Sequence, residues 1–156
     1  MFMDDVQRAK IAEEWLIDYC ADKGIKLIDV RDNINYQLED VDFILNGTKI
    51  DMKYDYKANE TGNLAFEIGK YSKAKMMMYD GNLNTTTSKY FLYWLNPKEI
   101  YKVDVAQLRK ALADNKRYYR LAHTNNDGDN YSVSIMALIN INSLHEWADC
   151  ITKVQI

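Results

Sequence analysis

The sequence predicts an α/β fold, a mixed central β-sheet flanked by helices, from three observations. Apolar residues recur at helical spacing over residues 5–22, whereas residues 41–56 alternate apolar and polar side chains as half-buried strands do. Residues 90–95 are almost wholly apolar or aromatic, which is typical of a central strand. The length of 156 residues, 47% of them hydrophobic, suits a single domain over residues 1–156 that folds without disulfides.

The first predicted element is a helix over residues 5–22, which Lys23-Gly24 ends in the manner of a C-terminal cap. Its apolar stripe consists of Ala9, Ala12, Trp15, Leu16, Tyr19 and Cys20. Residues 25–30 follow as a short strand or a buried connection.

A β-hairpin is the next predicted element. Residues 41–45 and 50–56 alternate in polarity on either side of Asn46-Gly47, which is the strongest short hairpin signal. Counting outward from a two-residue turn gives the pairs Leu45 with Thr48, Ile44 with Lys49, Phe43 with Ile50, and Asp42 with Asp51.

The remaining elements follow from the same patterns. We expect strands over residues 64–68, 90–95, 100–103, 118–122 and 131–139, and helices over 71–79, from the N-cap Asp104 to about 112, and over 143–151. Met76, Met77 and Met78 are expected to fill the core after a helical turn. The polar segment 126–130 reads as a solvated hairpin turn between two strands.

Composition excludes several classes of protein. Cys20 and Cys150 are far apart and form no Cys-x-x-Cys pair, which argues for buried thiols in a reducing compartment. His123 and His145 have no partner at metal-ligand spacing. The acidic N-terminus does not resemble a signal peptide, and the apolar runs are too short to span a bilayer. We expect no membrane partner and a cytoplasmic location, in the host cell if the protein is viral.

Asp42 and Asp51 are the candidate site because the hairpin register makes them cross-strand neighbours. Such neighbours have Cβ atoms about 4.5–5.5 Å apart, and like charges at that distance are destabilising unless a positive charge lies between them. The hard oxygen ligands favour Mg²⁺ or Mn²⁺ as that charge. Lys53 points to the same face. The alternative is that these are ordinary charges on a solvated hairpin face.

A metal held by two carboxylates beside a lysine suits phosphodiester hydrolysis. The metal polarises a phosphoryl oxygen and acidifies a water, while the lysine orients that water and offsets charge in the transition state. The sequence therefore favours a metal-dependent phosphodiester hydrolase.

This pattern resembles the PD-(D/E)XK nuclease superfamily, the restriction-endonuclease-like fold that includes small Holliday-junction resolvases and phage endonucleases. Asp42 matches its first acid, and Asp51-Met52-Lys53 matches its Asp/Glu-x-Lys triplet. The resemblance also implies a glutamate on the first helix. Glu13 lies nearer the apolar stripe than Glu14, so Glu13 completes the implied catalytic set of Asp42, Asp51, Lys53 and Glu13.

Two further motifs bear on this set. Glu67 alternates with apolar neighbours and is either a further metal ligand, beside Asp42, Asp51 and Glu13, or a solvent-facing strand residue. A second triplet, Asp55-Tyr56-Lys57, competes with the first but falls beyond the register with Asp42.

The net charge of −3 excludes a global basic field, so nucleic acid would have to bind a local patch. The candidate nucleic-acid-binding residues are Lys70, Lys73, Lys75, Arg109, Lys116, Arg117 and Arg120. Ordinary solvated faces are the alternative explanation. A homodimer is expected if the substrate is duplex or branched DNA, because cutting both strands needs two sites. Residues 90–94 and the last helix, with Trp147 and Ile151, are candidates for its contact surface, core burial being the alternative.

We therefore predict a nuclease that depends on Mg²⁺ or Mn²⁺ and hydrolyses DNA rather than RNA, with endonuclease action favoured. The first alternative is a catalytically silent nuclease-like fold that binds nucleic acid or protein. The second is a structural or partner-binding viral protein. Stabilisation by millimolar magnesium or manganese would separate the nuclease from both alternatives.

Overall fold

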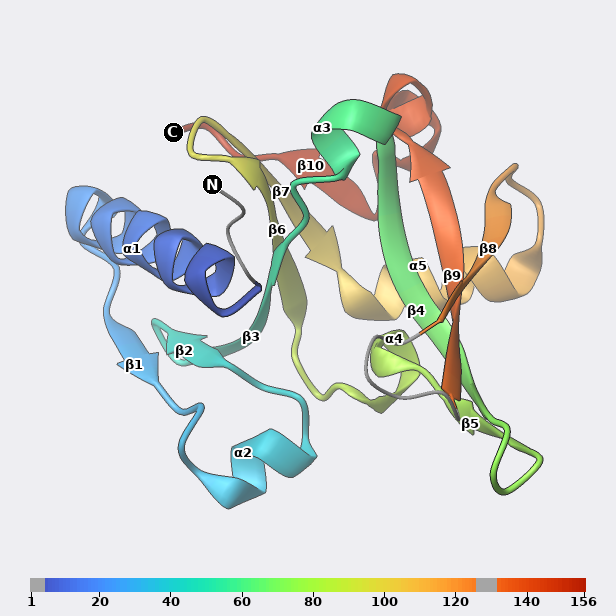
Figure 1. Cartoon of the computed structure of the whole chain (residues 1–156). Coiled ribbons are helices and arrows are strands. Elements are labelled where there is room, and N and C mark those ends of the chain that lie inside the picture. The colour runs from blue at the N-terminus through green and yellow to red at the C-terminus, as the bar shows by residue number, and fades with distance from the viewer. Residues whose placement is uncertain (1–4, 126–131) are drawn as a thin grey trace.

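A computed structural model describes residues 5–125 and 132–156 and has an α/β architecture with two β-sheets (Figure 1). The first sheet has six strands in the order β1 (Leu27–Asp29), β2 (Phe43–Leu45), β3 (Thr48–Tyr54), β6 (Tyr90–Asn96), β7 (Glu99–Asp104) and β10 (Ile151–Lys153). The second has four strands in the order β5 (Met77–Asp80), β4 (Asn63–Ser72), β9 (Ser132–Asn140) and β8 (Arg120–Asn125). The helices are α1 (Asp5–Lys23), α2 (Ile34–Leu38), α3 (Ala58–Thr61), α4 (Asn82–Thr85), α5 (Val105–Asp114) and the 3₁₀ helix η1 (Ile141–Trp147).

The six-stranded sheet is mixed, as predicted. β3 and β6 run parallel, while the other neighbouring pairs in this sheet are antiparallel. β6 lies in the middle and buries residues 91–95, in agreement with its apolar sequence. Because parallel strands cannot be joined by a tight turn, residues 55–89 form a long crossover between β3 and β6. That crossover contains α3, β4, β5 and α4.

Helix α1 confirms the predicted first element. Ala12, Leu16 and Cys20 are buried along one stripe, and Gly24 follows the helix with a φ of +67°, a left-handed conformation typical of a C-terminal cap. Glu13 is half-buried and Glu14 is exposed, so the predicted difference between the two glutamates is confirmed.

The predicted hairpin is present with the predicted turn. Asn46 and Gly47 both have positive φ values, 48° and 82°, as a two-residue hairpin turn requires. The register confirms three predicted pairs: Leu45 with Thr48, Ile44 with Lys49, and Phe43 with Ile50. The fourth predicted pair, Asp42 with Asp51, is not part of the strand register, which begins at Phe43. Side chains alternate along β3, so Ile50 and Met52 face α1, while Asp51 lies on the opposite face, toward α4.

Two hydrophobic clusters cover the two faces of the six-stranded sheet. One packs α1 against β2, β3 and β6, through Leu16, Cys20, Phe43, Ile50 and Trp94 among others. The other fills the space between the sheets and includes Phe66, Phe91, Tyr93, Ile139 and Trp147. Figure 1 shows α1 and the second sheet on opposite sides of β3 and β6. Trp147 and Ile151 are 0% and 3% exposed, so these two residues do not supply the surface patch suggested for a dimer.

The predicted helix over residues 71–79 is wrong. Residues 71–79 form the end of β4, a turn and β5, because β4 pairs with β9 on one side and β5 on the other as far as Ser72. This tertiary pairing overrides the helical propensity of the local sequence. Met76, Met77 and Met78 are consequently 78%, 54% and 56% exposed instead of filling the core.

The predicted last helix is shorter than expected. It is the 3₁₀ helix η1, capped by Asn140, after which residues 151–153 pair with β7 as strand β10. Both cysteines are buried and free, as predicted. The predicted turn at 126–130 lies outside the described residues. Within residues 5–125 and 132–156, no helix is long and apolar enough to cross a membrane.

Candidate functional site

Asp42 lies directly before the first residue of β2, and Asp51 lies on the neighbouring strand β3. The backbone N–H of Asp42 donates to the carbonyl of Ile50 over 3.0 Å, and the N–H of Met52 donates to Asp42 Oδ2 over 2.9 Å. The Asp42 side chain thereby reaches across to β3. Asp51 is 4% exposed, and the Asp42 carboxyl is near enough to raise the pKa of Asp51. The structure thus brings together the two predicted carboxyl groups.

The electrostatics of the pair are dominated by burial. Burial, with a smaller contribution from the charge of Asp42, raises the pKa of Asp51 to about 7, although Lys53 and Asn82 act in the opposite direction. Lys53 Nζ lies 3.4 Å from Asp51 Oδ2 and 5.3 Å from the ring centre of Phe91. A third of the Lys53 side chain remains exposed, so the ammonium group is accessible from solvent.

Glu67 is linked to the site by Asn82, which is the first residue of α4. The Asn82 side-chain amide donates to Asp51 Oδ2 over 2.9 Å, and its backbone N–H donates to Glu67 Oε1 over 3.1 Å. Glu67 Oε2 accepts a 2.8 Å hydrogen bond from the buried Ser134 hydroxyl. The half-buried Glu67 is therefore neither a solvent-facing strand residue nor in direct contact with the Asp51 carboxyl, but is connected to it by Asn82.

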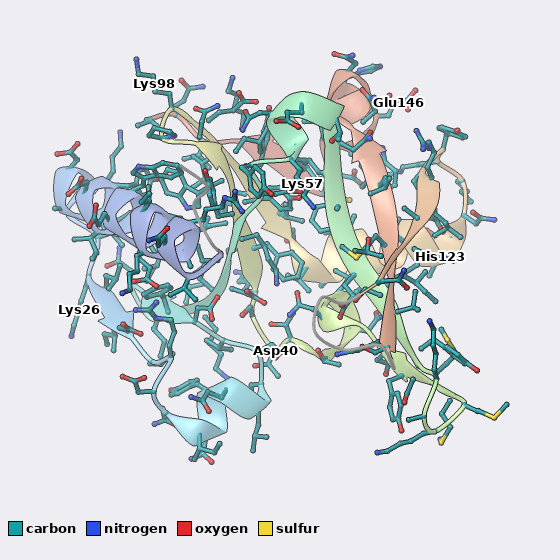
Figure 2. All side chains as sticks on the ribbon, in the orientation of Figure 1. Lys26, Asp40, Lys57, Lys98, His123 and Glu146 are labelled. Carbon is teal, nitrogen blue, oxygen red and sulfur yellow. The ribbon has the colours of Figure 1, made fainter. Side chains whose placement is uncertain are left out.

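Gly81 allows this connection because the chain passes very close to β4. A Cβ atom at position 81 would lie 2.5 Å from the carbonyl oxygen of Glu67, closer than real Cβ atoms approach. Only glycine fits at such a position. Figure 2 labels Asp40, which lies between α2 and α4. Its carboxylate accepts from Thr85, and its carbonyl accepts from Thr86 over 2.8 Å, so the segment leading to Asp42 is tied to α4 as well.

Glu13 is held away from this cluster. Its carboxylate pairs with Arg31, which also binds Asp29 over 2.6 Å. Helix α1 covers the face of the sheet that carries Ile50 and Met52, opposite the face that carries Asp51. The prediction that Glu13 completes the set is not supported by these contacts. Within residues 5–125 and 132–156, no three His, Cys, Asp or Glu side chains are arranged to hold a metal ion.

The competing triplet at residues 55–57 is structural. Asp55 Oδ1 accepts the N–H groups of Lys57 and Ala58 at the start of α3, over 3.0 and 3.3 Å. Asp55 Oδ2 accepts a 2.6 Å hydrogen bond from the buried hydroxyl of Tyr93. Asp55 therefore holds α3 and the core together.

The predicted basic residues lie in four separate places. Lys70, Lys73 and Lys75 lie on the β4–β5 hairpin, and Lys116 and Arg120 lie exposed after α5. Arg109 donates to the carbonyls of Leu83 and Thr86, over 2.6 and 2.5 Å, and so fixes the segment after α4. Arg117 pairs with Asp149 over 2.6 Å and lies 5.3 Å from the ring centre of Trp147. The basic residues do not form one surface around Asp51.

Sequence reasoning missed Asn82 and Ser134, which complete the hydrogen bonds around Asp51 and Glu67. Both are far from Asp51 in sequence, and a polar residue in a loop or strand gives no signal of its partner. The Gly81-Asn82 pair marks a break in the chain but does not indicate what it contacts.

Comparison of the chain with protein-family models, curated proteins and solved structures finds no match. The functional argument therefore depends on the residues of this chain alone.

Proposed function

We propose that the protein is a divalent-metal-dependent nuclease with its active site at Asp42, Asp51 and Lys53, on a restriction-endonuclease-like fold. The observation that carries this proposal is the proximity of two carboxyl groups, one on β3 and one just before β2, with Asp51 4% exposed and an ammonium group 3.4 Å from it. Two neighbouring carboxyl groups repel each other when both are ionised. The pair is therefore more stable when it holds a proton or a cation.

The donor set fits a hard divalent cation. Mg²⁺ is commonly bound by one or two carboxylates, with water and substrate phosphate completing its coordination. The hydrogen bonds from Met52 and Asn82 engage Oδ2 of Asp42 and Asp51, so these bonds leave the other oxygen of each carboxyl group for a ligand. Asp42 and Asp51 would hold the ion, and Glu67 would act from further away by positioning Asn82.

Each residue has a defined task in phosphodiester hydrolysis. A bound Mg²⁺ or Mn²⁺ would supply Lewis acidity at the phosphoryl oxygen and acidify a water. Lys53 offsets negative charge on the phosphate and donates a hydrogen bond to the attacking water. Asn82 stabilises the charged form of Asp51, which is the form that binds a cation.

A nuclease assay tests the proposal. The parent protein is incubated with single-stranded, duplex and branched DNA and RNA, with Mn²⁺, Mg²⁺ or EDTA. We expect cleavage that requires metal and is lost in Asp51→Asn and Lys53→Ala. Asp18→Asn and Lys10→Ala, at exposed positions of α1, are the matched controls and should cleave like the parent. Metal-independent cleavage, or equal loss in the controls, would contradict the assignment.

A catalytically silent binding module is the second candidate. One observation favours it: both carboxyl groups already have protein partners, because Asp42 accepts from Met52 and Asp51 from Asn82. A purely structural pair would give no thermal stabilisation by Mn²⁺ and no cleavage. The metal titration therefore separates the two candidates.

A further inference from the structure

The β4–β5 hairpin, defined here as residues 69–80, carries exposed apolar side chains at the edge of the second sheet. Its strands pair from Gly69 with Asp80 to Ser72 with Met77. Met76, Met77, Met78 and Tyr79 are 78%, 54%, 56% and 42% exposed. All four residues of β5 are exposed, and Figure 1 shows the hairpin turn projecting at the end of the sheet away from α3. Such an exposed apolar edge is unusual unless it contacts a partner.

The charge of the hairpin indicates an anionic partner. Residues 69–80 contain Lys70, Lys73 and Lys75 but one acid, Asp80, although the whole chain has a net charge of −3. Lys70, Lys73 and Lys75 are exposed, and Lys75 Nζ lies 5.9 Å from the ring centre of Tyr79. Cationic and apolar side chains therefore share one small surface.

Both ends of the hairpin are linked to the candidate active site through Asn82. On one side, Glu67 precedes the hairpin and binds the backbone N–H of Asn82. On the other side, Asn82 follows it and binds Asp51 over 2.9 Å. The base of the hairpin is therefore joined, through Asn82, to the residue that forms the candidate site.

The size of the hairpin matches a DNA groove. At about 3.3 Å per strand residue, the tip lies roughly 15 Å from Gly69. That length corresponds to between four and five steps of a duplex that rises about 3.4 Å per base pair. A two-stranded β-ribbon fits the major groove of B-form DNA.

We propose that the β4–β5 hairpin is the duplex-binding element of the protein. Lys70, Lys73 and Lys75 contact phosphates, and Met76, Met77 and Tyr79 contact base edges in the groove, so that the adjoining backbone is presented to Asp51. The identity of the ligand as nucleic acid rests on the proposed nuclease function. The choice of duplex over single strands rests on the shape of the hairpin.

Fluorescence anisotropy measures the binding of a labelled 20-base-pair duplex and of a labelled single strand of the same length. EDTA is present so that binding is measured without cleavage. We expect Lys73→Ala/Lys75→Ala to weaken duplex binding about tenfold or more, and to reduce the slope of log affinity against log salt by about two. Met76→Ser/Met77→Ser should weaken duplex binding several-fold without changing that slope. The matched control is Lys10→Ala/Lys23→Ala, which removes two exposed lysines of α1 and should bind like the parent.

Other outcomes separate this inference from the nuclease proposal. If the hairpin variants keep the parent's melting temperature and bind duplex like the parent, the inference is wrong, and metal-dependent cleavage by the parent still supports the nuclease. If the variants lose duplex binding but the parent never cleaves with Mn²⁺, the hairpin assignment stands and the nuclease fails. Vesicles containing phosphatidylserine provide a second arm. Loss of vesicle binding with unchanged duplex binding would overturn the inference in favour of a membrane surface.

Discussion

Asn82 and Asp51 join α4 to β3 through a 2.9 Å hydrogen bond from the Asn82 side-chain amide to Asp51 Oδ2. Because this bond stabilises the charged form of Asp51, Asn82→Ala should raise the pKa of Asp51 further and weaken stabilisation by Mn²⁺. It should also lower the free energy of unfolding by about 1–2 kcal/mol, measured by urea denaturation.

The matched control is Asn84→Ala, which removes an exposed side chain from the same short helix, bonded to the carbonyl of Ile68 over 3.3 Å. It should leave the response to Mn²⁺ unchanged. Equal effects of the two variants on that response would show that Asn82 acts only through the helix.

Because of Asp51, the metal-free protein should become less stable as the pH rises. An aspartate titrates near 3.9 in an unfolded chain, whereas burial raises the pKa of Asp51 to about 7. Between these values the folded state binds the extra proton, so the free energy of unfolding falls as pH rises through this range. We expect the difference in stability between pH 5 and pH 8 to be roughly 2 kcal/mol smaller in Asp51→Asn than in the parent.

Thermal denaturation of both proteins in EDTA across pH 4–9 measures this difference. Mn²⁺ should stabilise the parent more at pH 8 than at pH 5, because the ligands must lose their protons. Parallel pH profiles for parent and variant would contradict a raised pKa at Asp51.

Asp42 has two separable roles, which two substitutions distinguish. Asp42→Asn keeps an oxygen that can accept the N–H of Met52 but removes the repulsion toward Asp51, so it should raise the melting temperature in EDTA and abolish the response to Mn²⁺. Asp42→Ala leaves that N–H without its acceptor and should lower the free energy of unfolding by about 1–3 kcal/mol. Differential scanning fluorimetry with and without Mn²⁺ compares them, and an Asp42→Asn variant that still responds like the parent would exclude Asp42 as a ligand.

Tyr93 tests the structural assignment of Asp55. The Tyr93 hydroxyl donates to Asp55 Oδ2 over 2.6 Å and accepts the N–H of Ala65 over 3.0 Å. Tyr93→Phe leaves both groups without this partner, and should lower the free energy of unfolding by about 1–3 kcal/mol in urea titrations. Metal-dependent cleavage at a temperature where the variant is folded should be unchanged. Loss of cleavage by the folded variant would mean that the second triplet belongs to the active site.

The sequence predicted the elements whose signals are local. The stripe of α1, the Asn46-Gly47 turn and the Asp104 cap each depend on residues within a few positions of one another, and all three are confirmed. The turn fixes the register only as far as Phe43 with Ile50; Asp42, one residue beyond, donates its N–H to the carbonyl of Ile50 and is not paired with Asp51 in the strand register.

The elements that were missed depend on partners far away in the chain. Residues 71–79 became strand and turn because β9, more than 50 positions later, pairs with β4. A helical wheel favours Glu13 over Glu14 as a site residue because it identifies the buried face of α1. The wheel does not indicate which face of the sheet α1 covers. Asn82 reaches Asp51 through a contact 31 positions apart, for which the local sequence has no pattern.

The crossover between the parallel strands β3 and β6 separates the β4–β5 hairpin from the residues of the candidate site along the chain. The residues that would cleave lie before this segment, on β3 and just ahead of β2, whereas the hairpin that would bind duplex lies within it. Residues 73–76 can therefore be lengthened, shortened or exchanged without altering the pairing of β3 with β6 or the position of Asp51. If the hairpin binds duplex, exchanges confined to these four positions would alter substrate preference and leave the residues around Asp51 unchanged.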